Sequence, residues 1–213
     1  MSTYQPPRRP LHNAYYGKHL IFFPSRKTHV SIACHSALEK DYCVLLEYDV
    51  TVIYYESQPG PFHVNVATHP RRYTPDFFVE TTESAYYTEV KTDFQKLASR
   101  IGLKLEAAKE QFSRDGATLA FADIKSIRLN PKLSNLRFLY LHSFNVSDDE
   151  YGACLHLLSK LSYPISLRHI LDHPAQVRER AIYRALFSRK IAFDMTPRLS
   201  LETLIEEPPH ANH

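Results

Sequence analysis

Hydrophobic residues recur with two different periods along the first part of the chain, and each period predicts a different kind of element. In two segments the apolar residues return at steps of three or four, which predicts helices over residues 36–48 and 94–116. The first segment has Leu38, Tyr42, Leu45 and Leu46 on one face. The second has Phe94, Leu97, Ile101, Leu105, Ala108 and Phe112, and it ends near Gly116, a typical helix stop.

Runs of β-branched and aromatic residues predict strands between and after these two helices. The predicted strands cover residues 50–55, 62–66, 76–80, 85–91 and 118–122. A polar loop, residues 81–84, joins the third strand to the fourth. The order of a helix, four strands, a helix and a strand predicts an α/β fold in which helices flank a mixed sheet.

Strand signals become sparse beyond residues 130 and 131, and the pattern there is mainly helical. We predict helices over residues 133–143, 147–161, 166–171 and 175–188, and Ser147 with Glu150 forms a capping box at the start of the second. A strand, a turn and a strand follow in KIAFDMTPRLSLETLI. A run of three of these helices followed by a small hairpin has the order of a winged helix, although a plain helical packing domain fits nearly as well. The predicted domains are residues 1–128 and 129–213.

The composition is ordinary for a globular protein, with 44% hydrophobic and 23% charged residues among 213. No apolar run approaches the ~18 residues of a membrane span, and the N-terminus carries no apolar stretch of a secretory signal. The three cysteines form no CxxC pair, which argues against a disulfide framework or a zinc site. We therefore expect a cytoplasmic protein without membrane association.

Basic residues are unevenly placed, although the net charge is only +3. The chain before Leu38 contains no acidic residue, and its basic residues are Arg8, Arg9, Lys18, Arg26 and Lys27. Such a segment suits a nucleic-acid backbone, because each phosphate that it neutralises releases counterions. A solvated basic tail explains the same composition equally well.

The segment RRYTPDFFVETTESAYYTEVK contains the candidate chemistry. Asp76 heads one predicted strand, and Glu89 and Lys91 lie on the same face near the end of the next. If the two strands pair, the carboxylates of Asp76 and Glu89 approach each other, and two such oxygen ligands suit Mg²⁺. A lysine beside the metal can orient water and stabilise charge on a phosphate. The pattern predicts a metal-dependent phosphodiesterase, although a β-hairpin with a charged rim fits the same residues.

Other chemistries find no support in the sequence. The chain lacks the HExxH motif of zinc hydrolases and the GxSxG elbow of serine hydrolases. With only five glycines it also lacks a glycine-rich phosphate loop, so we expect no nucleotide cofactor.

Three segments, taken in order, resemble the TnsA family, the endonuclease subunit of heteromeric cut-and-paste transposases. They are HSALEKDYCVLLEYDVTVIYYESQP, RRYTPDFFV and YYTEVKT. The resemblance covers residues 20–125 in motif detail, and the helical remainder matches the family's winged-helix C-terminal domain in outline. It implies a restriction-endonuclease-like fold of the PD-(D/E)xK superfamily, followed by a mainly helical, winged-helix-like domain.

The resemblance also implies roles for particular residues. Asp76 matches the central metal ligand, and Glu89 matches the second ligand, which some family members replace by Gln. Lys91 matches the catalytic lysine. With the backbone carbonyl of Val90, these carboxylates would hold Mg²⁺, or Mn²⁺ in its place.

Glu39 matches a further catalytic and metal-binding glutamate, on the first helix of the family. A structural role is equally compatible with its position, because Ser36 and Glu39 have the spacing of a capping box. Four nearby polar residues are expected to support the site or to be solvated instead of taking part in chemistry. They are Asp41 and Glu47 on the same helix, and Glu56 and Gln58 at the end of the next strand.

The implied function is a Mg²⁺-dependent DNA endonuclease, a DNA-associated bacterial protein that hydrolyses the 5′ strand at transposon ends. Its implied partners are double-stranded DNA, a DDE-type transposase subunit that cuts and joins the 3′ ends, and an ATP-dependent regulator that contacts the C-terminal domain. Two alternatives stay open: a stand-alone restriction-like or repair endonuclease, and a DNA-binding adaptor with an inactive nuclease fold. The complete set of site residues argues against the adaptor.

Overall fold

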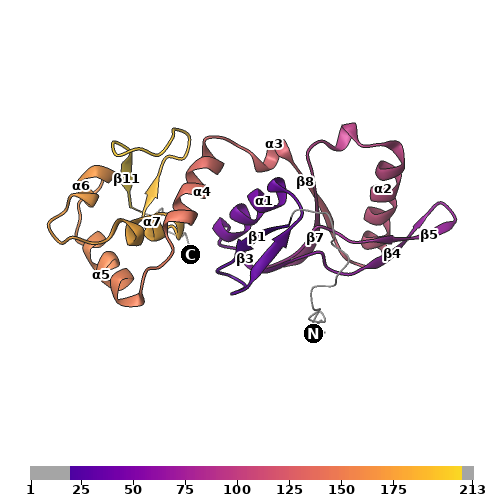
Figure 1. The fold of residues 1–213 in the computed structure, drawn as a ribbon, viewed down its shortest axis with the longest axis horizontal. Coiled ribbons are helices and arrows are strands. Elements are labelled where there is room, and N and C mark those ends of the chain that lie inside the picture. Colours follow the sequence, from indigo (N-terminus) through magenta and orange to yellow (C-terminus); the bar gives the residue numbers. More distant parts are fainter. Residues whose placement is uncertain (1–19, 208–213) are drawn as a thin grey trace. The chain divides into compact units, whose positions relative to one another are not determined.

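The structure is a computed structural model that describes residues 20–207, and the chain divides into two compact units (Figure 1). The N-terminal unit is Met1–Ile127 and the C-terminal unit is Arg128–His213. The division falls beside the predicted domain boundary. Within residues 20–207, no helix combines the length and the apolar character needed to cross a membrane.

The N-terminal unit is built on a mixed four-stranded sheet, so the predicted α/β class is confirmed. The strand order is β3-β6-β7-β8. The first two pairings are antiparallel, and β7 with β8 is parallel. A parallel pair needs a crossover connection, which helix α2 supplies. The elements are β3 (Val52–Ser57), β6 (Phe77–Thr81), β7 (Ala85–Lys91), a short 3₁₀ helix η1 (Phe94–Lys96), α2 (Ser99–Arg114) and β8 (Leu119–Asp123).

Two separate hairpins accompany this sheet, and the hydrophobic pattern predicts only one of their four strands. The first hairpin pairs β1 (Ile21–Pro24) with β2 (Ser31–Cys34), and the second pairs β4 (Phe62–Val66) with β5 (His69–Tyr73). Strand β5 reads HPRRY, and all of its residues except the last are exposed. Because it lacks apolar alternation, only its pairing with β4 makes it a strand.

Helix α1 (Ala37–Tyr48) begins as predicted, with the Ser36 side chain accepting the Glu39 N–H. Its buried face is broader than the apolar stripe, because α1 contacts β1, β2, β3 and β7. Asp41 and Glu47 are buried along with the apolar residues, so a solvated position for them is wrong. Helix α1 also contacts the short helix α3 (Ile124–Ile127), which follows β8.

Helix α2 covers one face of the β4–β5 hairpin and forms a second core with it. Leu105, Ala108 and Phe112 of the helix pack in one cluster with Val64 of β4 and Tyr73 of β5. The periodic residues Phe94 and Leu97 precede the helix, but they pack against the same cluster. The apolar period therefore locates most of the core, but it places the start of the helix too early and includes Ile101, which is exposed.

The C-terminal unit combines four helices with a small antiparallel sheet of order β10-β11-β9. Its elements are α4 (Lys132–His142), α5 (Asp148–Leu158), β9 (Ile165–Ser166), α6 (Leu167–Leu171), α7 (Glu179–Phe187), β10 (Ala192–Phe193) and β11 (Leu204–Glu206). The predicted capping box of Ser147 and Glu150 is present. Helix α7 starts later than predicted, because Gln176 has a φ of 48°, which is outside the helical region.

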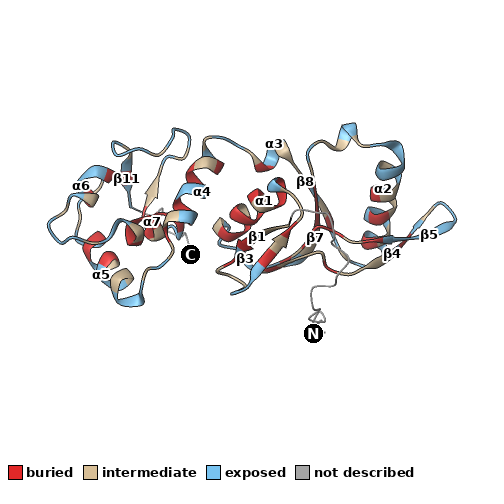
Figure 2. Ribbon diagram, in the orientation of Figure 1, coloured by how far each residue is buried: buried red, intermediate tan, exposed pale blue. Residues whose placement is uncertain are grey.

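Buried residues lie inside both units (Figure 2). In the C-terminal unit the buried faces of α4 and α7 contact each other. Asn135 of α4, itself buried, fixes the loop between β10 and β11. Its side chain donates to the Pro197 carbonyl (2.9 Å) and accepts the Leu199 N–H (2.9 Å). The long loop of this hairpin is thus anchored to the helical core.

Candidate active site

Asp76 and Glu89 come together because β6 and β7 pair. Phe77 lies opposite Thr88 in the register, which places the residue before β6 beside the end of β7. The N–H of Val90 donates to Asp76 Oδ2 at 2.7 Å, so the β7 backbone itself holds this carboxylate. Val90 is buried, and the side chains of Glu89 and Lys91 lie on the opposite face.

The Lys91 ammonium group contacts three oxygen atoms at once. Its Nζ lies 2.6 Å from Glu89 Oε1, 3.2 Å from Asp76 Oδ2 and 3.0 Å from the Val90 carbonyl oxygen. The two carboxylates are therefore within about 6 Å of each other, inside the ~8 Å beyond which they could not share one Mg²⁺. The oxygen atoms proposed as ligands converge on a single cationic position.

Tyr73 and Gln58 orient the two carboxylates from outside this group. The Tyr73 hydroxyl donates to Glu89 Oε2 at 2.7 Å, and burial raises the pKa of Tyr73, so the hydroxyl stays protonated and remains a donor. Gln58 Nε2 donates to Asp76 Oδ1 at 3.3 Å, and the Gln58 N–H donates to the Asp76 carbonyl at 2.9 Å. Sequence reasoning placed Gln58 near the site but missed Tyr73, whose only signal is its position three residues before Asp76.

Glu39 is the one predicted ligand that does not touch the others. Its carboxylate accepts the Ser36 hydroxyl (2.9 Å) and the His35 N–H (2.7 Å), which is a variant of the capping box shifted by one amide. Among residues 20–207, no three His, Cys, Asp or Glu side chains lie close enough together to hold a metal. The observed contacts of Glu39 are those of a helix cap.

The negative charge of Asp76 nevertheless affects the carboxyl group of Glu39. Burial raises the pKa of its carboxyl above the usual value, and the negative charge of Asp76 raises it further, against the lowering effect of its two hydrogen bonds. The two groups are therefore near enough for their charges to repel. A cation between them would relieve this repulsion.

The pKa shifts of Glu89 and Lys91 also reflect the negative charges beside them. Burial raises the pKa of Glu89, the Asp76 charge raises it further, and Lys91 only partly opposes the shift. Burial acts to lower the pKa of Lys91, but the charges of Asp76 and Glu89 outweigh it, and the net shift is upward. Lys91 is therefore cationic, and its charge does not fully offset the effects of burial and of Asp76 on the pKa of Glu89.

The donor atoms fit a hard divalent cation. Two carboxylates and a peptide carbonyl are the ligands that Mg²⁺ prefers, and here they already surround a cationic nitrogen. Asp76, Glu89 and the Val90 carbonyl could hold Mg²⁺ or Mn²⁺, with Lys91 beside it. Glu56 does not belong to this group, since its carboxylate accepts the Tyr54 hydroxyl (3.3 Å) instead.

In the described part of the basic N-terminal segment, the ammonium group of Lys27 contacts the fold itself. Arg26 and Lys27 lie between β1 and β2, in a loop that Glu47 binds through the Ser25 hydroxyl (2.5 Å) and the Arg26 N–H (3.3 Å). The Lys27 ammonium donates to the Val52 carbonyl (2.6 Å) and to that of Asp49, beyond the end of α1. This role differs from the phosphate contact suggested by composition. Three further basic residues lie outside the described residues: Arg8, Arg9 and Lys18.

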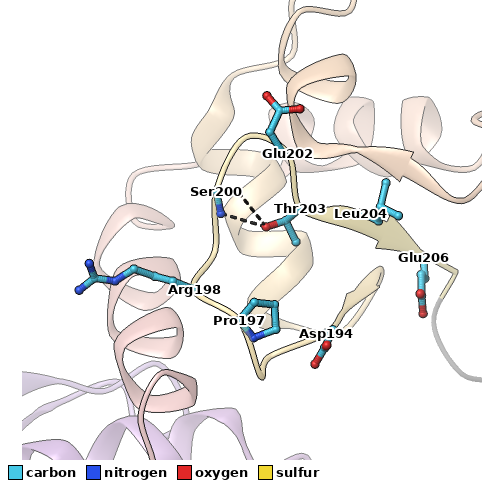
Figure 3. Close-up of a pocket in the computed structure, with 8 residues that line it drawn as sticks. All are labelled: Asp194, Pro197, Arg198, Ser200, Glu202, Thr203, Leu204 and Glu206. Atoms are coloured by element: carbon cyan, nitrogen blue, oxygen red, sulfur yellow. Dashed lines mark hydrogen bonds between the residues drawn. The ribbon is translucent and has the colours of Figure 1, made fainter.

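A hollow in the C-terminal unit has no comparable convergence of groups. It lies against the loop between β10 and β11, where the Ser200 N–H donates to Thr203 Oγ1 at 2.9 Å (Figure 3). Figure 3 shows the side chains of Arg198, Glu202 and Glu206 pointing in different directions. Since its charged groups do not meet, this hollow is not a candidate for catalysis.

No model of a known protein family matches the chain, and no curated protein is similar to it in sequence.

Proposed function

We propose that the N-terminal unit is a Mg²⁺-dependent endonuclease that hydrolyses DNA. The observation that supports this most strongly is the convergence of Asp76, Glu89 and the Val90 carbonyl on one cationic position beside Lys91. The resemblance of the sequence to the TnsA motifs adds the restriction-endonuclease-like assignment of the sheet. A divalent metal held by two carboxylates beside a lysine suits phosphodiester hydrolysis.

Each side chain has a distinct task in this proposal. Asp76 and Glu89 hold the metal, and the Val90 N–H and the Tyr73 hydroxyl keep the two carboxylates in place. When bound, Mg²⁺ lowers the pKa of water and polarises the phosphate. Lys91, held cationic by its two carboxylate neighbours, stabilises the negative charge that develops on the phosphate.

The proposed biological role is cleavage of the 5′ strand at transposon ends. A DDE-type transposase subunit would cut and join the 3′ ends, and an ATP-dependent regulator would contact the C-terminal unit. The order of helices followed by paired strands in that unit is compatible with a winged helix. The stand-alone nuclease and the inactive adaptor are the alternatives that an experiment must separate.

Sequencing the products of transposition tests the proposed role against both alternatives. With Asp76→Ala, the partner's 3′ cut and strand joining should proceed while the 5′ strand stays attached to the donor. Replication would then give fused donor and target molecules in place of clean insertions. The control is Glu83→Ala, which removes an exposed carboxylate from the loop between the same two strands.

Both alternatives predict that Asp76→Ala leaves the transposition products unchanged. Clean insertions at the wild-type frequency in the Asp76→Ala complex would therefore refute cleavage of the 5′ strand at transposon ends. Fused products with Glu83→Ala would show that the switch does not depend on the site.

A further inference from the structure

The β4–β5 hairpin has one covered face and one bare face. Val64 and Tyr73 are buried against α2, whereas the turn and most of β5 are exposed (Figures 1 and 2). The exposed positions of the hairpin are His63, Asn65, Ala67, Thr68, His69, Pro70, Arg71 and Arg72. In the four-stranded sheet β3 pairs directly with β6, so the hairpin stands outside it as a separate arm.

The charge of this arm is entirely positive. No Asp or Glu occurs between Glu56 and Asp76, and the segment contains two arginines and two histidines. Arg71 and Arg72 are exposed, and their guanidinium groups form no hydrogen bond or ion pair with any part of the chain between residues 20 and 207. Nothing in the described part of the fold therefore uses these two guanidinium groups.

The register places cationic groups on both faces of the hairpin. His63 lies directly opposite Arg72 and shares its face, whereas Arg71 lies opposite Val64 on the other face, because side chains alternate along a strand. Like charges placed opposite each other destabilise a β-pair, so a protonated His63 repels Arg72. An anion lying against this pair would relieve that repulsion.

The arm is rigid at its base. The ring of Phe62 lies 4.9 Å from that of Phe112 and 5.2 Å from that of Tyr87, both in edge-on contacts. Tyr73 also packs edge-on against Phe112, at 6.0 Å. These contacts fix the hairpin to α2 and β7, so its arginines are presented by an ordered element and not by a flexible tail.

The arm leads directly into the candidate active site. Tyr73 is the last residue of β5 and donates to Glu89, and Asp76 follows three positions later. Four residues of strand from Tyr73 to His69 span about 13 Å, which is about four base pairs of duplex DNA. A backbone lying along the arm would thus run from the metal site outward.

We propose that the β4–β5 hairpin is a phosphate-binding arm that holds the backbone of duplex DNA beside the cleavage site. The proposal rests on the proposed function for the position of the scissile phosphate. Arg71 and Arg72 each neutralise a phosphate, and His63 adds a donor beside Arg72. Because these groups contact phosphates instead of bases, the arm contributes affinity without sequence preference.

The test is the salt dependence of DNA binding by the full chain. Fluorescence anisotropy with a labelled 30-base-pair duplex is measured in EDTA, so that binding is separated from cleavage. Each phosphate contact contributes about 0.9 to the slope of log K against log salt concentration, so Arg71→Ala with Arg72→Ala should reduce the slope by about 2. At low salt the affinity should fall roughly tenfold or more. Arg71→Lys with Arg72→Lys retains both charges and should retain the slope.

The matched control is Arg100→Ala with Arg114→Ala, which removes the same charge from exposed positions of α2. An equal loss of slope in this control would mean that only net charge matters, and the proposal would be wrong. An unchanged slope in the hairpin variant, or no binding by the wild-type chain, would overturn it as well. Equally tight, arginine-dependent binding of duplex RNA would refute the assignment to DNA.

The binding measurement and the nuclease test can fail independently. The Asp76→Ala chain should bind the duplex with the wild-type salt slope, since the hairpin arginines are intact. If that chain binds normally and the wild-type chain produces no 5′ cut, the arm stands and the nuclease assignment fails. If cleavage depends on Asp76 but the hairpin variant binds the duplex with the wild-type salt slope, the nuclease assignment stands and the arm proposal fails.

Discussion

At the scale of single residues, the site is defined by how its carboxylates are held. Glu89 accepts a hydrogen bond from the Tyr73 hydroxyl and forms an ion pair with Lys91. Asp76 accepts hydrogen bonds from the Val90 N–H and from Gln58, and it also forms an ion pair with Lys91. These partners set the direction of each carboxylate lone pair. Residues that orient ligands typically affect metal affinity almost as much as the ligands do.

Tyr73→Phe tests this orientation with a minimal change. Removing the hydroxyl should weaken Mg²⁺ or Mn²⁺ binding by about 10- to 100-fold, because Glu89 loses the donor that fixes it. The measurement is a metal titration by calorimetry. Tyr54→Phe is the control, since it removes a tyrosine hydroxyl that donates to Glu56, a carboxylate outside the site. Equal metal affinities in both variants would contradict the orienting role.

Glu39→Gln tests whether this buried carboxyl carries an electrostatic cost. Its native pKa is raised above the usual 4.5, so the native state keeps a proton that the unfolded chain has lost. The stability of the metal-free protein should therefore fall as pH rises from 4.5 through the native pKa. Glutamine removes that fall and keeps an acceptor for the His35 N–H.

The expected result is a melting temperature about 2–4 °C above wild type at neutral pH, with no difference below pH 4.5. Thermal melts in EDTA across this pH range provide the measurement. The exposed control Glu83→Gln should change nothing at any pH. A Glu39→Gln protein that is less stable than wild type at all pH values would show that the cap, and not the charge, dominates.

At the scale of elements, α1 binds the β1–β2 hairpin through a buried carboxylate. Glu47 accepts the Ser25 hydroxyl at 2.5 Å and the Tyr55 hydroxyl at 2.8 Å, and it also accepts backbone N–H groups of the loop. This one carboxylate therefore joins α1 to the loop between β1 and β2 and to Tyr55 of β3.

Glu47→Ala should therefore be strongly destabilising. It leaves at least two buried donors without their acceptor, each costing about 1–3 kcal/mol, so the free energy of unfolding should fall by about 2–6 kcal/mol. Urea unfolding followed by circular dichroism measures the change. Glu47→Gln retains one acceptor and should lose less than half as much. A loss within about 0.5 kcal/mol for the alanine variant would show that solvent replaces the carboxylate.

The elements also show what the sequence can predict. Helix α1, strands β4, β6, β7 and β8 and helices α4 to α6 follow from apolar period and capping, because their local preferences agree with their tertiary positions. Strands β1, β2, β5 and β9 are short or polar, and they exist through pairing partners that no local pattern reveals.

The candidate site divides in the same way. Asp76, Glu89 and Lys91 can be predicted together, because strand alternation and one hairpin fix their relation. The contribution of Tyr73 could not be predicted, since it depends on how the β4–β5 hairpin folds back against β7. Glu39 shows the opposite limit: its position on α1 is predictable, but its choice between cap and ligand depends on distances between elements.

At the scale of the whole molecule, the two units have different proposed functions. The described part of the N-terminal unit contains the convergent carboxylates and the basic hairpin, whereas the hollow seen in the C-terminal unit has no convergent charged groups. The proposal therefore assigns hydrolysis and backbone binding to residues 1–127 and contacts with partner proteins to residues 128–213. The central claim is that Asp76 and Glu89 share one divalent metal.

Anomalous scattering from crystals soaked in Mn²⁺ tests this claim most directly. The account predicts a single strong peak with oxygen atoms of Asp76, Glu89 and the Val90 carbonyl at about 2.2 Å, and no such peak in crystals of Asp76→Ala. Glu83→Ala crystals should retain it. A peak elsewhere in the protein, an absent peak in the wild type, or an unchanged peak in Asp76→Ala would contradict the account.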